Sequence, residues 1–176
     1  MLGAWDGVSS AFPGGVDAGS GQLATLGISA RSVHCGGDYS LVSNGDGTVS
    51  GWGTNTAYPL TVDRPLEQRL PIGRSPSLTG FSNLSAGLDL ACGLKANKPY
   101  CWGLNDRGQA TGTLAPATMP TDLGIVDAAE VYAGVTHSCA QLAGGRILCW
   151  GSNDFSQISS GPSGLKAPTE VLGLAQ

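Results

Sequence analysis

Short apolar runs alternate along this chain with clusters of glycine, asparagine, aspartate and proline. The run Thr48–Trp52, for example, follows the turn sequence 44–47 (Asn-Gly-Asp-Gly) and the shorter run Ser40–Val42. Asn, Asp and Gly tolerate the positive φ angles of tight turns, so this stretch predicts an antiparallel hairpin. Glycine (28 residues) and proline (10 residues) are too frequent for long helices, and the pattern therefore predicts an all-β chain.

The hairpin pattern recurs, and the tryptophans mark its period. Trp5, Trp52, Trp102 and Trp150 are separated by 47, 50 and 48 residues. A glycine lies 15 or 16 residues before each of the last three tryptophans, and an asparagine lies three residues after it. These repeat positions are Gly36, Trp52 and Asn55; Gly87, Trp102 and Asn105; and Gly134, Trp150 and Asn153. A period near 48 residues is typical of propeller blades.

The register divides the single domain 1–176 into full repeats at approximately 32–80, 81–128 and 129–176, after a partial repeat at 1–12. In the partial copy Trp5 keeps its place, but other residues replace the glycine and the asparagine. We expect four short strands in each repeat, and hence a β-propeller of about three full blades plus partial ones. A closed propeller needs more blades. The chain is therefore interpreted as part of a longer chain, with assembly from several chains or an open arc as alternatives.

Four of the five cysteines hold fixed places in the repeat. One pair of places, Cys92 and Cys139, lies five residues after the repeat glycine, and the other, Cys101 and Cys149, directly precedes the tryptophan. In the first full copy both places are taken by other residues, Leu41 and Gly51, as expected if the two members of a pair bond to each other.

Opposed residues of a hairpin come within disulfide range, so we predict the bonds Cys92–Cys101 and Cys139–Cys149. Four reduced, buried thiols are one alternative. A zinc site is the other, although the ligand spacing lacks the usual close cysteine pair. Cys35 replaces the alanine of the other copies and is expected to be a small core residue, or to pair with a segment outside this chain. Disulfides imply an oxidising compartment. The sequon at Asn83 would suit glycosylation there.

The third copy carries the clearest family pattern, Ala-Gly-Val-Thr-His-Ser-Cys-Ala at 133–140 and Leu-Cys-Trp-Gly-Ser-Asn at 148–153. Over roughly residues 32–157 the chain resembles the regulator of chromosome condensation repeat family. The resemblance implies a seven-bladed β-propeller whose loops bind other proteins. The paired-cysteine variant is similar to repeats in crinkly-type receptor kinase ectodomains and in secreted microbial members. No exchange-factor motif of the family can be matched to residues of this chain.

Charge and hydropathy narrow the function classes. The net charge is −4 and the nine basic residues are scattered, so nucleic acid is not an expected partner. No apolar run approaches the ~18–20 residues of a membrane span. The N-terminus has neither the basic region nor the apolar core of a signal peptide. Neither a cofactor nor a metal ion is expected.

Three groups of residues suggest chemistry, and each has a structural interpretation that we prefer. His137 is a repeat residue expected to pack or to hydrogen-bond at a strand start, and no nucleophile elbow accompanies it. His34 is expected to be exposed. The tryptophans would bind sugars only if exposed, and we expect them to pack between blades instead. The sequence 44–47 resembles half a calcium loop but lacks the later glutamate.

We therefore expect a non-enzymatic, extracellular module for protein–protein contact or assembly, with unidentified protein partners or other propeller segments. The alternative is a cytoplasmic regulator of the exchange-factor type with free thiols. Loops 13–30, 54–80 and 106–122 differ most between copies and should carry specific binding. The longest, around Arg64, Arg69 and Arg74, is the candidate binding loop. Its truncation is expected to abolish binding while the fold stays intact.

Overall fold

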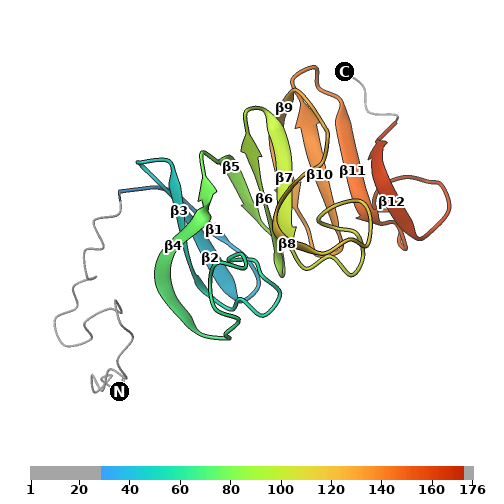
Figure 1. Ribbon diagram of the computed structural model, residues 1–176. Coiled ribbons are helices and arrows are strands. Elements are labelled where there is room, and N and C mark those ends of the chain that lie inside the picture. The colour runs from blue at the N-terminus through green and yellow to red at the C-terminus, as the bar shows by residue number, and fades with distance from the viewer. Residues whose placement is uncertain (1–28, 173–176) are drawn as a thin grey trace, which may run out of the picture.

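The computed structural model describes residues 29–172, which form three four-stranded antiparallel sheets (Figure 1). The first sheet contains β1 (Ala30–Cys35), β2 (Tyr39–Asn44), β3 (Thr48–Gly53) and β4 (Leu70–Thr79). The second contains β5 (Ser82–Ala86), β6 (Leu90–Lys95), β7 (Lys98–Gly103) and β8 (Ala117–Asp122). The third contains β9 (Ala128–Ala133), β10 (His137–Leu142), β11 (Ile147–Ser152) and β12 (Leu165–Glu170). The all-β prediction is confirmed. Trp5 and the partial repeat 1–12 lie outside the described residues, as does nearly all of loop 13–30.

Each sheet is a meander in which consecutive strands pair. The turns between the second and third strands follow the local sequence: Ala96 and Asn97 have φ of 51° and 58°, and Gly47 has φ of 80°. Positive φ at both central residues matches the right-handed twist of the strands that they join. In the third repeat, residues 127–130 read alone would also suit a helical turn, but Ala128–Ala133 is strand β9, paired with β10.

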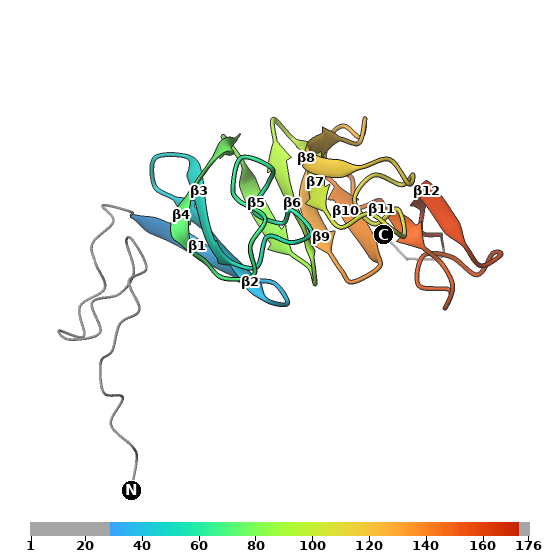
Figure 2. The same cartoon turned by 60° about the horizontal axis from the view of Figure 1, so that its bottom comes forward.

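The sheets lie side by side (Figures 1 and 2). The first strand of each sheet contacts the first strand of the following one, β1 with β5 and β5 with β9. Two apolar clusters fill the spaces between them. One joins the first and second sheets through Tyr39, Leu41, Leu60 and Trp102, and the other joins the second and third. Burial of these side chains is the main stabilising term of the stack.

The repeat tryptophans fill the junctions between sheets. Trp102 and Trp150 are 0% exposed. Their indole Nε1 atoms donate to the carbonyl oxygens of Pro59 (2.9 Å) and Gln109 (3.0 Å) of the preceding repeat. Buried indoles cannot stack on a sugar, which argues against the sugar-binding alternative at these two positions. Trp52 is only half-buried, and within residues 29–172 its indole has no hydrogen-bond acceptor.

The repeat asparagines organise the long loops between the third and fourth strands. Asn153, 1% exposed, accepts from the amides of Ile158 (2.9 Å) and Ser159 (3.0 Å) through Oδ1. Its Nδ2 donates to the carbonyl oxygens of Ser159 (3.1 Å) and Pro162 (3.0 Å). Asn55 and Asn105 make corresponding bonds in their own loops. One amide thus satisfies several backbone groups that no strand pairs.

Replacing Asn153 with alanine is expected to lower the free energy of unfolding by about 2–4 kcal/mol, because several buried backbone groups lose their partner together. The matched control is Asn97→Gly, since glycine adopts the φ of 58° at this turn without strain. Urea denaturation of both variants measures the difference. Equal stability of the two would show that the Asn153 amide does not hold its loop.

Candidate protein-interaction site

Both predicted cysteine pairs are disulfide-bonded in the structure. Cys92 and Cys101 face each other across β6 and β7, and Cys139 and Cys149 across β10 and β11. In the first sheet the corresponding register pair is Leu41 and Gly51. A Cβ on Gly51 would lie 2.9 Å from the Leu41 side chain, so the leucine occupies the space that a disulfide takes in the other two sheets.

Two expectations on β1 are wrong. Cys35 is an exposed free thiol, not a core residue, and His34 is half-buried rather than exposed. The equivalent alanines, Ala86 and Ala133, pack against the cluster that joins their sheet to the preceding one. Within residues 29–172 no sheet precedes the first, so Cys35 has no such surface. His34 lies 2.8 Å from the Ser32 hydroxyl, and burial lowers its pKa.

The sequon residues take part in the junction between the second and third sheets. Asn83 Oδ1 accepts from the amide of Val131 at 2.8 Å, and Ser85 Oγ accepts from the amide of Ala133 at 2.9 Å. Asn83 has φ of 47° and is exposed. These two side chains therefore have a structural role that the sequence pattern did not reveal, and glycosylation at Asn83 stays a prediction.

His137 begins β10, at the strand start where the sequence placed it. Its carbonyl oxygen accepts from the Gly134 amide at 2.9 Å, and its ring lies over Gly134, where an added Cβ would be 3.3 Å from Nδ1. Burial of the ring lowers its pKa. These contacts describe a packed histidine at the start of the hairpin.

The structure separates the three arginines of the candidate binding loop. Arg64 turns into the first sheet, where its Nη1 donates to the Gly51 carbonyl at 3.3 Å and burial lowers its pKa, opposed by the charge of Asp63. Arg74 lies on β4 and forms an ion pair with Asp46 at 2.7 Å. Arg69 lines a pocket that is described below. The expectation that this loop could be truncated without damage to the fold is wrong, because Leu60 is core and β4 begins at Leu70.

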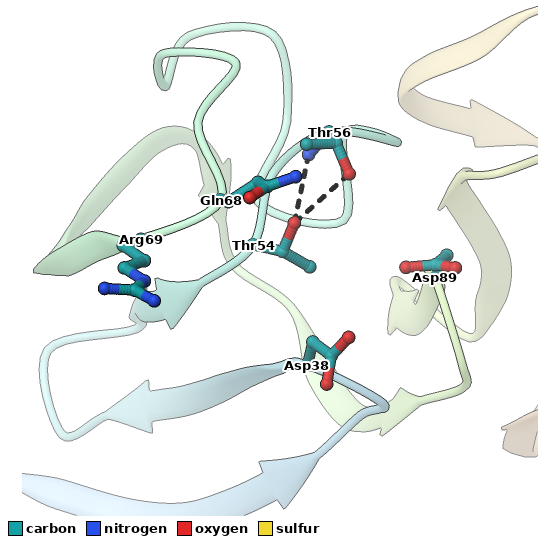
Figure 3. Close-up of a pocket in the computed structure, with 6 residues that line it drawn as sticks. All are labelled: Asp38, Thr54, Thr56, Gln68, Arg69 and Asp89. Carbon is teal, nitrogen blue, oxygen red and sulfur yellow. Dashed lines mark hydrogen bonds between the residues drawn. The ribbon is translucent and has the colours of Figure 1, made fainter.

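We call the loop face the end of the three sheets that carries the connections between first and second strands and between third and fourth strands. In a meander these connections leave the sheet at the same end. A pocket of about 500 Å³ opens on the loop face at the junction of the first two sheets (Figure 3). Its lining residues are Asp38, Thr54, Thr56, Gln68, Arg69 and Asp89. A second hollow of about 400 Å³ shares Thr56 and continues toward Leu114 and Pro116.

Backbone hydrogen bonds hold the two acidic residues of the pocket in place. The Asp38 carbonyl oxygen accepts from the Thr54 amide and that of Asp89 from the Leu104 amide, both at 2.8 Å. Figure 3 shows the Asp38 and Asp89 carboxylates facing the pocket from neighbouring sheets, with Arg69 on the opposite side. Burial of the phenol, and then the charge of Asp89, raise the pKa of Tyr39.

The sequence 44–47, which resembles half a calcium loop, forms a turn that is held by hydrogen bonds to Asp46. Asp46 Oδ1 accepts from the Thr48 hydroxyl at 2.6 Å and Asp46 Oδ2 from Arg74 at 2.7 Å, and these bonds lower the pKa of the carboxyl. Within residues 29–172 no three or more His, Cys, Asp or Glu side chains gather in a way that could hold a metal ion. Nor does any helix in the described part have the length and apolar character of a membrane span.

Sequence reasoning named Arg69 and the loop 54–80 but missed the two acidic residues of the pocket, Asp38 and Asp89. A signal was present, since an aspartate lies two residues after the repeat glycine in the first two copies, at Asp38 and Asp89, and is replaced by Thr136 in the third. The repeat alone did not show that the two carboxylates enter one pocket, because that depends on how the sheets pack.

Comparison with known proteins matches one repeat of the chain to a described family. Residues 128–157 match the family described as "Regulator of chromosome condensation (RCC1) repeat". The third repeat therefore matches an RCC1-type repeat. The chain has 31% identity over 141 residues to the "Secretion-regulating guanine nucleotide exchange factor" of Bos taurus, covering 72% of this chain and 30% of that protein. It has 28% identity over 170 residues to "RCC1 domain-containing protein RUG3, mitochondrial" of Arabidopsis thaliana, covering 88% and 37%.

Solved structures show the same fold. Human WBSCR16 is similar with a TM-score of 0.69 and 19% identity, over 83% of this chain and 40% of that one. Yeast RCC1 (Prp20), in its structure with Kap60 bound, is similar with a TM-score of 0.53 and 14% identity, over 82% and 49%. The predicted fold, a partial propeller of the regulator of chromosome condensation type, is thereby confirmed. The chain spans about a third of the length of the curated relatives that it matches. The crinkly-type extracellular subtype stays a prediction.

Proposed function

We propose that this chain is a non-enzymatic, extracellular propeller module that binds another protein through its loop face. The observation that carries the proposal is that the repeat residues and the loop residues have different roles. The repeat tryptophans, asparagines and disulfides serve the scaffold, whereas charged side chains without a partner are presented by the loops. Kap60 bound to yeast RCC1 is a precedent for protein binding by this fold. His137, packed on Gly134, supports a scaffold role rather than catalysis.

The extracellular part of the proposal is supported by the two disulfides. Disulfides persist in oxidising compartments and are rare where glutathione keeps thiols reduced. The test is a mass spectrum after thiol alkylation, without reductant, on protein from its native source. We expect one label, on Cys35, and linked peptides for the two disulfides. Five labels would contradict an oxidising compartment, but they would not contradict the propeller fold.

Protein binding through the loop face is tested with a photo-crosslinking residue at two exposed positions. Thr56 lies on the loop face, and Gly144 lies in the hairpin turn between β10 and β11 at the opposite end of the sheets. In living source cells we expect one discrete adduct from position 56 and none from position 144. Adducts from position 144 alone would move the binding surface to the other end, and no adduct from either position would contradict the protein-binding proposal.

The second candidate is an intracellular exchange-factor type of regulator. It is favoured by the 31% identity to the secretion-regulating exchange factor. The assay is release of a fluorescent guanine nucleotide from a panel of small GTPases, with the whole chain as catalyst. The propeller-module proposal expects no acceleration. If the chain accelerated nucleotide release from any GTPase of the panel in a saturable way, the second candidate would be established instead.

A further inference from the structure

The pocket on the loop face between the first two sheets holds charged groups whose partners are missing. Within residues 29–172, the side chains of Asp38, Asp89 and Arg69 form no ion pair and no hydrogen bond. Other acidic side chains of the described chain, such as Asp46, Asp122, Asp154 and Glu170, are paired with a lysine or an arginine. In the described residues the side chains of Glu67 and Asp127 also have no such partner, so what distinguishes Asp38 and Asp89 is that both line one pocket.

We propose that this pocket binds an arginine side chain of a protein partner between Asp38 and Asp89. The inference rests on the proposed function as a protein-binding module and names the chemistry of its partner. Two carboxylates that enter one pocket from neighbouring sheets repel each other, and a cation between them removes that repulsion. A guanidinium has five donors in a planar fork, which suits a pocket lined by more than one carboxylate.

The remaining lining residues suit a polar partner segment. The Thr54 hydroxyl is buried and lies 3.1 Å from that of Thr56, so the floor offers oxygen acceptors to further N–H groups. Arg69, on the far wall, can donate to a carbonyl or carboxylate of the same segment (Figure 3). Sites for small molecules are mostly apolar and enclose their ligand. This pocket is polar and four of its six lining residues are exposed, which fits a side chain presented by a protein surface.

The next junction along the chain provides an internal comparison. At the positions of Thr54 and Asp89 the second and third sheets carry Leu104 and Thr136. At the position of Thr56 it carries Asp106, which is paired with Gln109 and Arg107. A leucine thus replaces the Thr54 hydroxyl and the added carboxylate is already paired, so this junction is not expected to bind the same group. The arginine site is thus a property of one junction and not of the repeat.

The test is a titration of the full isotope-labelled chain, observed by backbone amide NMR, with the probe acetyl-Gly-Arg-Gly-amide. We expect saturable shifts at Asp38, Thr54 and Asp89 and none at Leu104 or Thr136. The same peptide with neutral citrulline in place of arginine should bind about tenfold more weakly, because it lacks the charge. Asp38→Asn and Asp89→Asn should each weaken the arginine peptide by about three- to tenfold, and the double variant should abolish binding.

The matched control is Asp127→Asn, the same chemical change at an exposed turn with φ of 58° at the other end of the sheets. It should leave binding unchanged. Equal binding of the citrulline peptide, or an equal effect of Asp127→Asn, would overturn the proposal. So would calcium chloride producing the pocket shifts while the arginine peptide does not, since the pocket would then be a cation site. If the peptide fails but cross-linking at Thr56 still captures a partner, the protein-binding function stands and only the arginine site falls.

Discussion

Replacing Trp102 with alanine is expected to lower the free energy of unfolding by about 3–5 kcal/mol. Trp102 is fully buried between the first two sheets, and its ring lies 5.4 Å from that of Phe81. The substitution leaves a cavity and removes the donor that the buried Pro59 carbonyl uses. Thermal and urea denaturation, followed by tryptophan fluorescence and circular dichroism, measure the loss.

Trp52→Ala is the control for this experiment, because it removes the same side chain at the same place in the repeat. Trp52 is half-buried, and its indole has no acceptor within residues 29–172. We expect a loss of about 1 kcal/mol, set by the smaller apolar area that it buries. Equal losses for the two variants would contradict this difference in burial and mean that Trp52 is covered as fully as Trp102.

Removing both disulfides is the second change with a large expected effect. Each closes a short loop, with sequence separations of 9 and 10 residues. The chain-entropy model gives about 2–3 kcal/mol for each bond. The variant Cys101→Ala/Cys149→Ala should therefore lose roughly 5 kcal/mol, which is a large part of the stability of an ordinary domain. Denaturant midpoints with and without reductant measure it.

Cys35→Ala separates the loss of a bond from the loss of a thiol. Cys35 is exposed and forms no disulfide in the structure, so its replacement should change stability by less than about 0.5 kcal/mol. Reductant should lower the midpoint of the wild type and of Cys35→Ala equally. No effect of reductant on the wild type would show that the four paired cysteines are reduced in solution.

The local features of the fold were predictable because the same sequence pattern occurs in several repeats. The tight turn at Ala96-Asn97 follows from residues that accept positive φ. The disulfide Cys92–Cys101 follows from register, because both of its positions are replaced together, by Leu41 and Gly51, in the first full copy. The pairing of the second strand with the third follows as well, because a short turn joins them and consecutive strands are usually neighbours.

The binding face was less predictable, because it depends on contacts between repeats. Nothing in the sequence near Arg64 distinguishes it from Arg69, yet Arg64 packs over Gly73 while Arg69 lines the pocket. The difference arises because Gly73 on β4 leaves space for a guanidinium where any other residue would place a side chain. That this loop binds a partner stays a prediction, and of its three arginines it is Arg69 that lines the pocket on the loop face.

The sequence by itself determined the repeat, the strands and the cysteine pairing, because each is settled by side chains within one meander. The tertiary structure alone decided which residues lie at the junctions. It left Cys35 exposed although Ala86 and Ala133 are covered, and it directed Asp38 and Asp89 into one pocket. The physical reason is that a strand face is covered, or two charges are brought together, only when the next sheet packs against the first. The sequence of a single repeat does not specify that packing.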